Sequence, residues 1–129
     1  MKLLLDTNAY SALARGDAVV AERVRKAERI LLSSIVAGEL LHGFRRGSQY
    51  KENRRQLDAF LARPFVEIVH VGLITADRFA RIMTALHVKG RPIPTNDVWI
   101  AAHAMETGAE LLTRDRHFEE IDGLVWSSF

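Results

Sequence analysis

The feature that most constrains the fold of this chain is the alternation of short apolar runs with longer segments of helical periodicity. The apolar runs have the length of buried strands, and the segments between them have the length and spacing of helices. Strands that alternate with helices are typical of an α/β fold with a mainly parallel sheet. We therefore expect strands at residues 3–5, 30–32, 66–69, 110–112 and 124–126, and helices at residues 7–14, 18–28, 34–46, 50–61, 75–88 and 97–107.

Several of the expected helix ends carry residues that favour a start or a stop. Ser33 or Ser34 can cap the helix that runs to Arg46, and Asn96 can cap the helix that begins at Asp97. Gly108 is expected to end that last helix, because glycine is common just beyond helix C-termini. A short helical turn is expected at residues 117–120.

The composition is that of a folded protein of ordinary domain size. The chain has 129 residues, 48% of them hydrophobic, so we expect one domain over residues 1–129. It contains no cysteine, which excludes disulfides and thiolate metal sites and leaves oxygen or imidazole ligands for a metal. Asp6 interrupts the apolar start too early for a signal peptide, and no later stretch is long enough to span a membrane. We therefore expect a cytoplasmic protein.

Four acidic side chains fall where an α/β fold builds its sites. Asp6 directly follows the first expected strand, Asp115 comes shortly after the fourth, and Glu39 lies in the helix after the second. Asp97 stands at the start of a helix, next to the Asn96 cap. Because sites form outside the carboxyl ends of parallel strands, these carboxylates can converge at one edge of the sheet. Each aspartate also has a local role open to it, as the cap of a helix or turn or as a charge that favours a helix dipole.

Glu39 is harder to explain by a local role. It lies between residues 35–38 and the pair Leu40 and Leu41 in an apolar helix, where a carboxylate is costly to bury without a positive partner. An Arg or Lys side chain is one such partner, and a metal ion is the other. Carboxylates that converge without a cation raise each other's pKa, and hard oxygen ligands select Mg²⁺ or Mn²⁺ over zinc. Such ions activate water and stabilise charge on a phosphoryl group, which is the chemistry of phosphodiester cleavage.

Four short motifs give the chain a resemblance to a known family. They are LDTN at residues 5–8, SSIVAGELLHG at residues 33–43, NDVWIAA at residues 96–102 and TRDRHF at residues 113–118. In this order, and over essentially the whole chain, they resemble the motifs of the PIN-domain ribonucleases. The similarity is greatest to the VapC-type toxins of bacterial toxin–antitoxin pairs.

The resemblance implies a three-layer α/β/α sandwich and RNA cleavage that depends on Mg²⁺ or Mn²⁺. On this basis Asp6, Asp97 and Asp115 are the main metal ligands, and Glu39 is a further ligand or the general base. Attack by water, rather than by the ribose 2′-hydroxyl, would leave a 5′-phosphate and a 3′-hydroxyl. The resemblance also implies a homodimer and a separate VapB-type antitoxin that blocks the site.

Three further residues are candidates for supporting roles. The resemblance places Asn8 and Thr113 near the acids, where they would orient ligands or waters. Arg46 comes seven residues after Glu39 on the same helix, so the two share a face. Arg46 is either a contact to substrate phosphate or a surface charge. It belongs to a basic stretch, since residues 15–63 hold eleven Lys/Arg and six Asp/Glu, and that stretch is either solvated or phosphate-binding.

The main alternative is a catalytically silent PIN-like module that holds RNA or a protein partner without cutting. Four acids that repel one another argue against it, because a protein that only binds has no need of them. A receiver domain would need an acidic pair after the first strand, where this chain has only Asp6. A haloacid-dehalogenase phosphatase would need an aspartate in place of Asn8. The sequence thus predicts a metal-dependent nuclease and leaves the identity of its RNA open.

Overall fold

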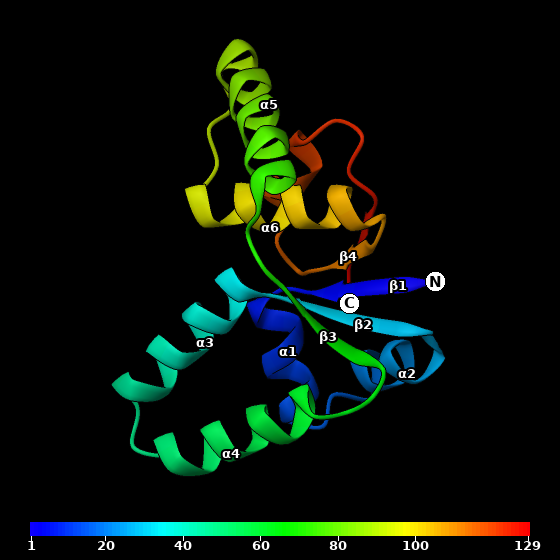
Figure 1. The fold of residues 1–129 in the computed structure, drawn as a ribbon, viewed down its shortest axis with the longest axis vertical. Coiled ribbons are helices and arrows are strands. Elements are labelled where there is room, and N and C mark those ends of the chain that lie inside the picture. Colours follow the sequence, from blue (N-terminus) through cyan, green and yellow to red (C-terminus); the bar gives the residue numbers. More distant parts are fainter.

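The computed structural model describes residues 1–129 and confirms the α/β fold (Figure 1). Its sheet has five strands in the order β3-β2-β1-β4-β5, and every pairing is parallel. The strands are β1 (Lys2–Leu5), β2 (Arg29–Ser33), β3 (Val66–Val69), β4 (Glu110–Leu112) and β5 (Trp126–Ser127).

Helices cover the two faces of this sheet. One face carries α1 (Thr7–Ala14), α2 (Ala18–Lys26), α3 (Ser34–Arg46) and α4 (Tyr50–Leu61), which lie below the strands in Figure 1. The other face carries α5 (Leu73–Lys89) and α6 (Thr95–Thr107), which lie above them. A short 3₁₀ turn, η1 (Arg116–Glu120), follows β4. The expected three-layer α/β/α arrangement is therefore confirmed. No helix combines the length and the apolar character that a membrane span requires.

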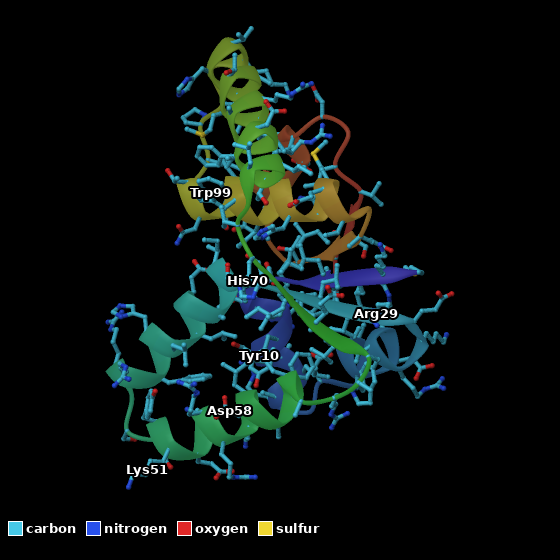
Figure 2. The ribbon with its side chains drawn as sticks, in the orientation of Figure 1. Tyr10, Arg29, Lys51, Asp58, His70 and Trp99 are labelled. Carbon is cyan, nitrogen blue, oxygen red and sulfur yellow. The ribbon has the colours of Figure 1, made fainter.

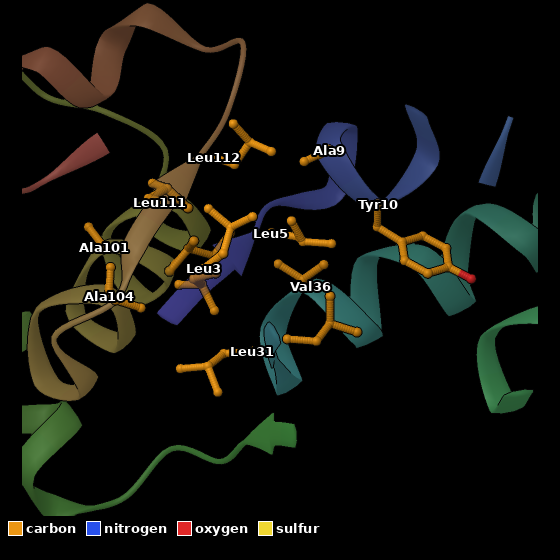
Figure 3. Packing of buried hydrophobic residues seen from close by; sticks show 14 of the residues in the cluster. Leu3, Leu5, Ala9, Tyr10, Leu31, Val36, Ala101, Ala104, Leu111 and Leu112 are labelled. Atoms are coloured by element: carbon orange, nitrogen blue, oxygen red, sulfur yellow. The ribbon is translucent and has the colours of Figure 1, made fainter. Parts of the chain in front are cut away.

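The central strands supply the middle of the hydrophobic core. Leu3 and Leu5 of β1 are fully buried, and helices shield the two faces of the sheet, so the strand is an unbroken apolar run rather than an alternating one. Figure 3 shows Val36 of α3 on one side of these leucines and Ala101 and Ala104 of α6 on the other. Burial of one leucine side chain contributes roughly 1.5–3 kcal/mol, so this layer fixes the position of the strand that ends at Asp6.

The order of the strands places a topological switch point between β1 and β4. From β1 the chain runs outward through β2 to β3, and it then crosses to the other side of β1 to form β4 and β5. Sites in α/β folds form at such a switch point. Asp6 directly follows β1 and residues 113–115 follow β4, so the sheet itself brings them to this point.

Several element boundaries differ from the sequence prediction by one or two residues, among them both ends of α5, which runs over Leu73–Lys89 rather than residues 75–88. The last long helix begins at Thr95 and has Pro94 at its N-cap, and the side chain of Asn96 makes no cap hydrogen bond. Pro94 can precede a helix because it has no N–H to leave unpaired and its φ is fixed at a suitable value. The second helix ends at Lys26 because Ala27 is extended, and the last strand pairs through Trp126 and Ser127 rather than through residues 124–126.

Candidate active site

Asp6 caps a helix and also belongs to an acid cluster. Its carboxylate accepts a hydrogen bond from the Ala9 N–H at 2.8 Å, which fixes the side chain at the start of α1. Asp6 is only 6% exposed, and this burial is the largest cause that raises the pKa of its carboxyl group. The Thr113 hydroxyl and the Ala9 amide lower that pKa, whereas the nearby Asp97 and Asp115 carboxylates raise it. The capping role and the site role therefore coexist.

Asp97 extends the cluster from the opposite layer of the fold. It lies in the first turn of α6, whose N-terminal dipole favours a carboxylate. Its pKa is raised, firstly by burial and then by the charges of Asp115 and Glu39, while His117 acts in the opposite direction. The carboxylates of Asp97 and Glu39 thus influence each other although they belong to α6 and α3, which are in contact.

Glu39 is held by neutral hydrogen-bond donors. The Thr7 hydroxyl donates to one carboxylate oxygen at 2.6 Å, and the Asn96 amide donates to the other at 3.4 Å. No Arg or Lys forms an ion pair with Glu39, so a basic side chain does not balance its charge. The helix starts of α1 and α6 therefore orient this carboxylate without neutralising it.

Asp115 and His117 complete the cluster. Asp115 caps the η1 turn by accepting the His117 N–H at 3.2 Å, and its own N–H donates to the Thr113 hydroxyl at 2.9 Å. This turn brings the His117 ring between two carboxylates. Its Nδ1 lies 2.8 Å from Asp115 Oδ1, and its Nε2 lies 2.5 Å from Asp97 Oδ2.

His117 is a site residue that the sequence analysis missed. The five histidines show no spacing that joins one to another as metal ligands, and so none of them was singled out. The signal that was present is the position of His117, two residues after Asp115 in the TRDRHF motif. A residue two places after a capping aspartate donates its N–H to that cap, which keeps its side chain nearby.

The structure thus brings the four predicted acids together at the carboxyl edge of the sheet. Their only cationic or titratable partner is His117, and no Arg or Lys neutralises them. Asp97, Asp115 and His117 each offer one ligand atom, and these three atoms lie within 4.8 Å of one another. This spacing is close enough for the three residues to share an ion. Carboxylate oxygens with one imidazole nitrogen are a donor set that fits a divalent cation.

A family comparison agrees with this geometry. The sequence model of the PIN-domain family matches residues 3–124 of this chain, a span that includes all four acids. The chain belongs to the PIN-domain family.

Relatives of this PIN domain match it over nearly its full length. Ribonuclease VapC2 of Rickettsia felis is 32% identical over 97% of this chain and 96% of that protein. The tRNA(fMet)-specific endonuclease VapC of Shigella flexneri is 28% identical over 96% and 95% of the two chains. The VapBC2 structure from Rickettsia felis, bound to a promoter DNA fragment, has a TM-score of 0.88 at 27% identity and covers 100% of this chain and 99% of that chain. These matches confirm the VapC-type resemblance, and the relatives' names agree with the expected enzyme class.

The three supporting residues of this PIN domain lie in different surroundings. Thr113 is fully buried, and its hydroxyl lies beside Asp6 and accepts the Asp115 N–H. Asn8 is exposed and makes none of the hydrogen bonds that hold the acids, whereas the adjacent Thr7 does. Arg46 is exposed at the end of α3 and forms no ion pair. Their functional roles stay predictions.

Six of the eleven cations in the basic stretch form ion pairs, four of them with an acid on the same helix. On α4, Arg54 pairs with Asp58 and Arg55 pairs with Glu52. Figure 2 shows Lys51 and Asp58 on this helix, on the opposite side of the sheet from α6. Exposed pairs of this kind contribute roughly 0.2–1 kcal/mol each. Apart from Lys51, the α4 part of the stretch is therefore a solvated surface with its charges paired.

Proposed function

We propose that this PIN domain is a metal-dependent endoribonuclease and the toxin of a toxin–antitoxin pair. The observation that carries the proposal is the convergence of Asp6, Glu39, Asp97 and Asp115 with no Arg or Lys among them. Carboxylates that repel one another are unfavourable in a folded protein unless a cation joins them. The names of the relatives supply the substrate class, which is RNA.

The donor set supports Mg²⁺ or Mn²⁺ as the cofactor. Asp6, Asp97 and Asp115 would hold the ion, because their carboxylates are close enough to influence one another. Such an ion lowers the pKa of water and offsets the charge that develops on the scissile phosphate. Glu39, held by Thr7, is a further ligand or the base that takes a proton from the attacking water. The expected products carry a 5′-phosphate and a 3′-hydroxyl.

An open groove beside the acids supports an approach path for the RNA backbone. Arg91, Arg116 and His117 are among the residues that line it. Arg116 pairs with Glu119, whereas Arg91 is exposed and forms no ion pair. Free cations near an acidic site attract the phosphate backbone without reading its sequence. We infer that Arg91 contacts RNA phosphate on this side of the acids and that Arg46 does so from α3.

The relatives also guide the proposals for substrate and partners. Because one relative is named a tRNA(fMet)-specific endonuclease, transfer RNA is the first substrate to test. Because a solved relative is a VapBC complex, we propose a VapB-type antitoxin as the protein partner. We further propose that residues 1–129 act as one nuclease domain, in the cytoplasm and as a homodimer. Light scattering of the protein with and without the antitoxin would test the dimer.

The test of the function is cleavage of a small-RNA pool that includes initiator transfer RNA. Purified protein is incubated with Mg²⁺, Mn²⁺ or EDTA, beside the variants Asp97→Asn and Asp77→Asn. Asp77 is an exposed aspartate of α5 that pairs with Arg81, so its variant controls for the loss of an acidic side chain elsewhere. We expect cleavage that needs a metal, persists in the Asp77 variant and falls at least about 100-fold in the Asp97 variant.

The ends of the cleaved RNA, and the absence of cleavage, distinguish the proposed mechanism from its alternatives. Ends with a 2′,3′-cyclic phosphate would rule out attack by water. RNA binding without cleavage under either metal, in protein free of antitoxin, would favour the silent module. Cleavage that survives in the Asp97 variant would mean that the acid cluster is not the active site.

A further inference from the structure

His117 is the one histidine that contacts the acid cluster. Its two ring nitrogens face Asp97 and Asp115 at 2.5 Å and 2.8 Å, and its side chain is 32% exposed. The sequence motifs and the comparisons assign no role to it. An imidazole between two carboxylates is either a hydrogen-bonding support for them or a donor to the same ion.

The position of the ring is fixed by the turn that carries it. The His117 N–H donates to Asp115, and the next residue, Phe118, is fully buried and anchors η1 to the core. Because backbone and neighbour are both held, the ring stays close to the two aspartates and has little freedom to swing into solvent. A ligand that is held in place in this way loses little conformational entropy on binding an ion.

The distances suit a shared ion. One ligand atom from each of Asp97, Asp115 and His117 falls within 4.8 Å of the other two. Neighbouring ligands of a six-coordinate ion, each about 2.1 Å from it, lie about 3 Å apart. The contact of 2.5 Å between His117 Nε2 and Asp97 Oδ2 is slightly shorter, so a small side-chain rotation would admit an ion between this pair. The contact of 2.8 Å to Asp115 uses the other ring nitrogen, so Nδ1 would keep its hydrogen bond to that carboxylate while Nε2 binds the ion.

We propose that His117 is a nitrogen ligand of the metal in this site, and that the site therefore prefers a first-row transition ion such as Mn²⁺ to Mg²⁺. The proposal rests on the metal-dependent function proposed above. Mg²⁺ is bound almost entirely by oxygen, whereas imidazole nitrogen is a good ligand for transition ions. The three aspartates supply the charge, and His117 supplies the selectivity.

Pulsed EPR of Mn²⁺ bound to the metal-free protein tests the proposal, because it detects a nitrogen coordinated to the ion. We expect the nitrogen coupling of an imidazole in the wild type and in His87→Gln, and its loss in His117→Gln. His87 is an exposed histidine of α5 that forms no hydrogen bond or ion pair with the acids, so it is a matched control. We also expect the preference for Mn²⁺ over Mg²⁺, measured by competition, to fall about tenfold or more in His117→Gln.

The wild-type spectrum decides the question even if the variant fails to fold. Bound Mn²⁺ without nitrogen coupling would overturn the proposal, as would an unchanged metal preference in a folded His117→Gln protein. These measurements contain no RNA, so they are independent of the proposed nuclease activity. RNA cleavage without nitrogen coupling would refute the ligand role alone. Nitrogen coupling without cleavage of any RNA would refute the nuclease function alone.

Discussion

At the scale of single residues, Asp6 couples stability to function. Its carboxylate accepts the Ala9 N–H, while burial and the charges of Asp97 and Asp115 raise its pKa. A raised pKa means that the metal-free folded state binds the proton more tightly than the unfolded state. The charge of Asp6 is therefore unfavourable to the folded state at neutral pH, and this penalty disappears as the pH falls toward the usual aspartate pKa of about 3.9.

Asp6→Asn should therefore lose activity and gain stability without metal. The amide keeps an oxygen for the helix cap and removes the charge. We expect RNA cleavage to fall at least about 100-fold and the thermal midpoint in EDTA at pH 7 to rise. Melting curves of the two proteins at pH 7 and pH 4 measure this, and the difference should shrink at the lower pH. A lower midpoint for the variant at pH 7 would show that the charge stabilises the fold.

His103 is a second residue whose pKa predicts a measurable effect. Its ring is fully buried, Nδ1 lies 2.9 Å from the Ser33 hydroxyl, and Nε2 has no hydrogen-bond partner. Burial lowers the pKa of His103, and the His70 backbone and the Glu106 carboxylate oppose this more weakly. Because the unfolded chain takes up the proton more readily, this residue makes stability fall as the pH drops below the usual histidine pKa of about 6.5.

Urea unfolding between pH 7 and pH 5 tests this prediction. We expect the wild type to lose more free energy of unfolding over this range than His103→Gln, whose side chain does not titrate. His87→Gln is the control for the same substitution at an exposed position, on α5. Equal pH dependence in the wild type and the His103 variant would contradict the prediction.

At the scale of elements, Glu39 depends on three helices at once. It lies on α3, the Thr7 hydroxyl at the start of α1 donates to it at 2.6 Å, and Asn96 at the start of α6 donates to it at 3.4 Å. The position of this carboxylate is therefore set by how the helix starts meet at the sheet edge. Loss of one donor should misplace the carboxylate more than it weakens the fold.

Thr7→Val tests this arrangement, because valine has the shape of threonine and lacks the hydroxyl. We expect cleavage to fall about tenfold, less than the roughly 100-fold minimum for losing a whole acid–base contribution because Glu39 itself remains, and stability to change by about 1 kcal/mol or less. Thr84→Val is the control, since the Thr84 hydroxyl donates to the Ala80 carbonyl on the exposed side of α5. Equal activities of the two variants would mean that Thr7 does not position Glu39.

The elements themselves were largely predictable from the sequence. The periodicity of apolar residues is local, and it placed α1 at Thr7–Ala14, α4 at Tyr50–Leu61 and β3 at Val66–Val69. The start of α6 was placed wrongly, because the helix begins at Thr95 after Pro94 and Asn96 lies inside its first turn. The Asn96 side-chain amide donates to Glu39 on another helix, a contact that a pattern along the chain does not reveal.

At the scale of the whole molecule, charge should guide RNA to the site. Arg91 is an unpaired cation on the groove beside the acids, and Lys51 is an unpaired cation on α4, on the opposite side of the sheet from α6 (Figure 2). In the non-cleaving Asp97→Asn background, we expect Arg91→Ala to weaken RNA binding. The slope of log affinity against log salt concentration should become shallower by roughly one. Binding measured over a range of salt concentrations shows this. An equal effect of Lys51→Ala would mean that the attraction is diffuse rather than aimed at the groove.

The sequence by itself determined the alternation of strands and helices and the four acids at or near strand ends, because periodicity and capping act over a few residues. The tertiary structure decided which strands are neighbours, and hence that Asp6 and Asp115 follow adjacent strands and come close together. It also decided the partners of the acids. Asn96 meets Glu39 across 57 residues of chain, and His117 meets Asp97 across 20. Hydrogen bonds and charges act over a few ångströms in space, and only the folded chain sets those distances.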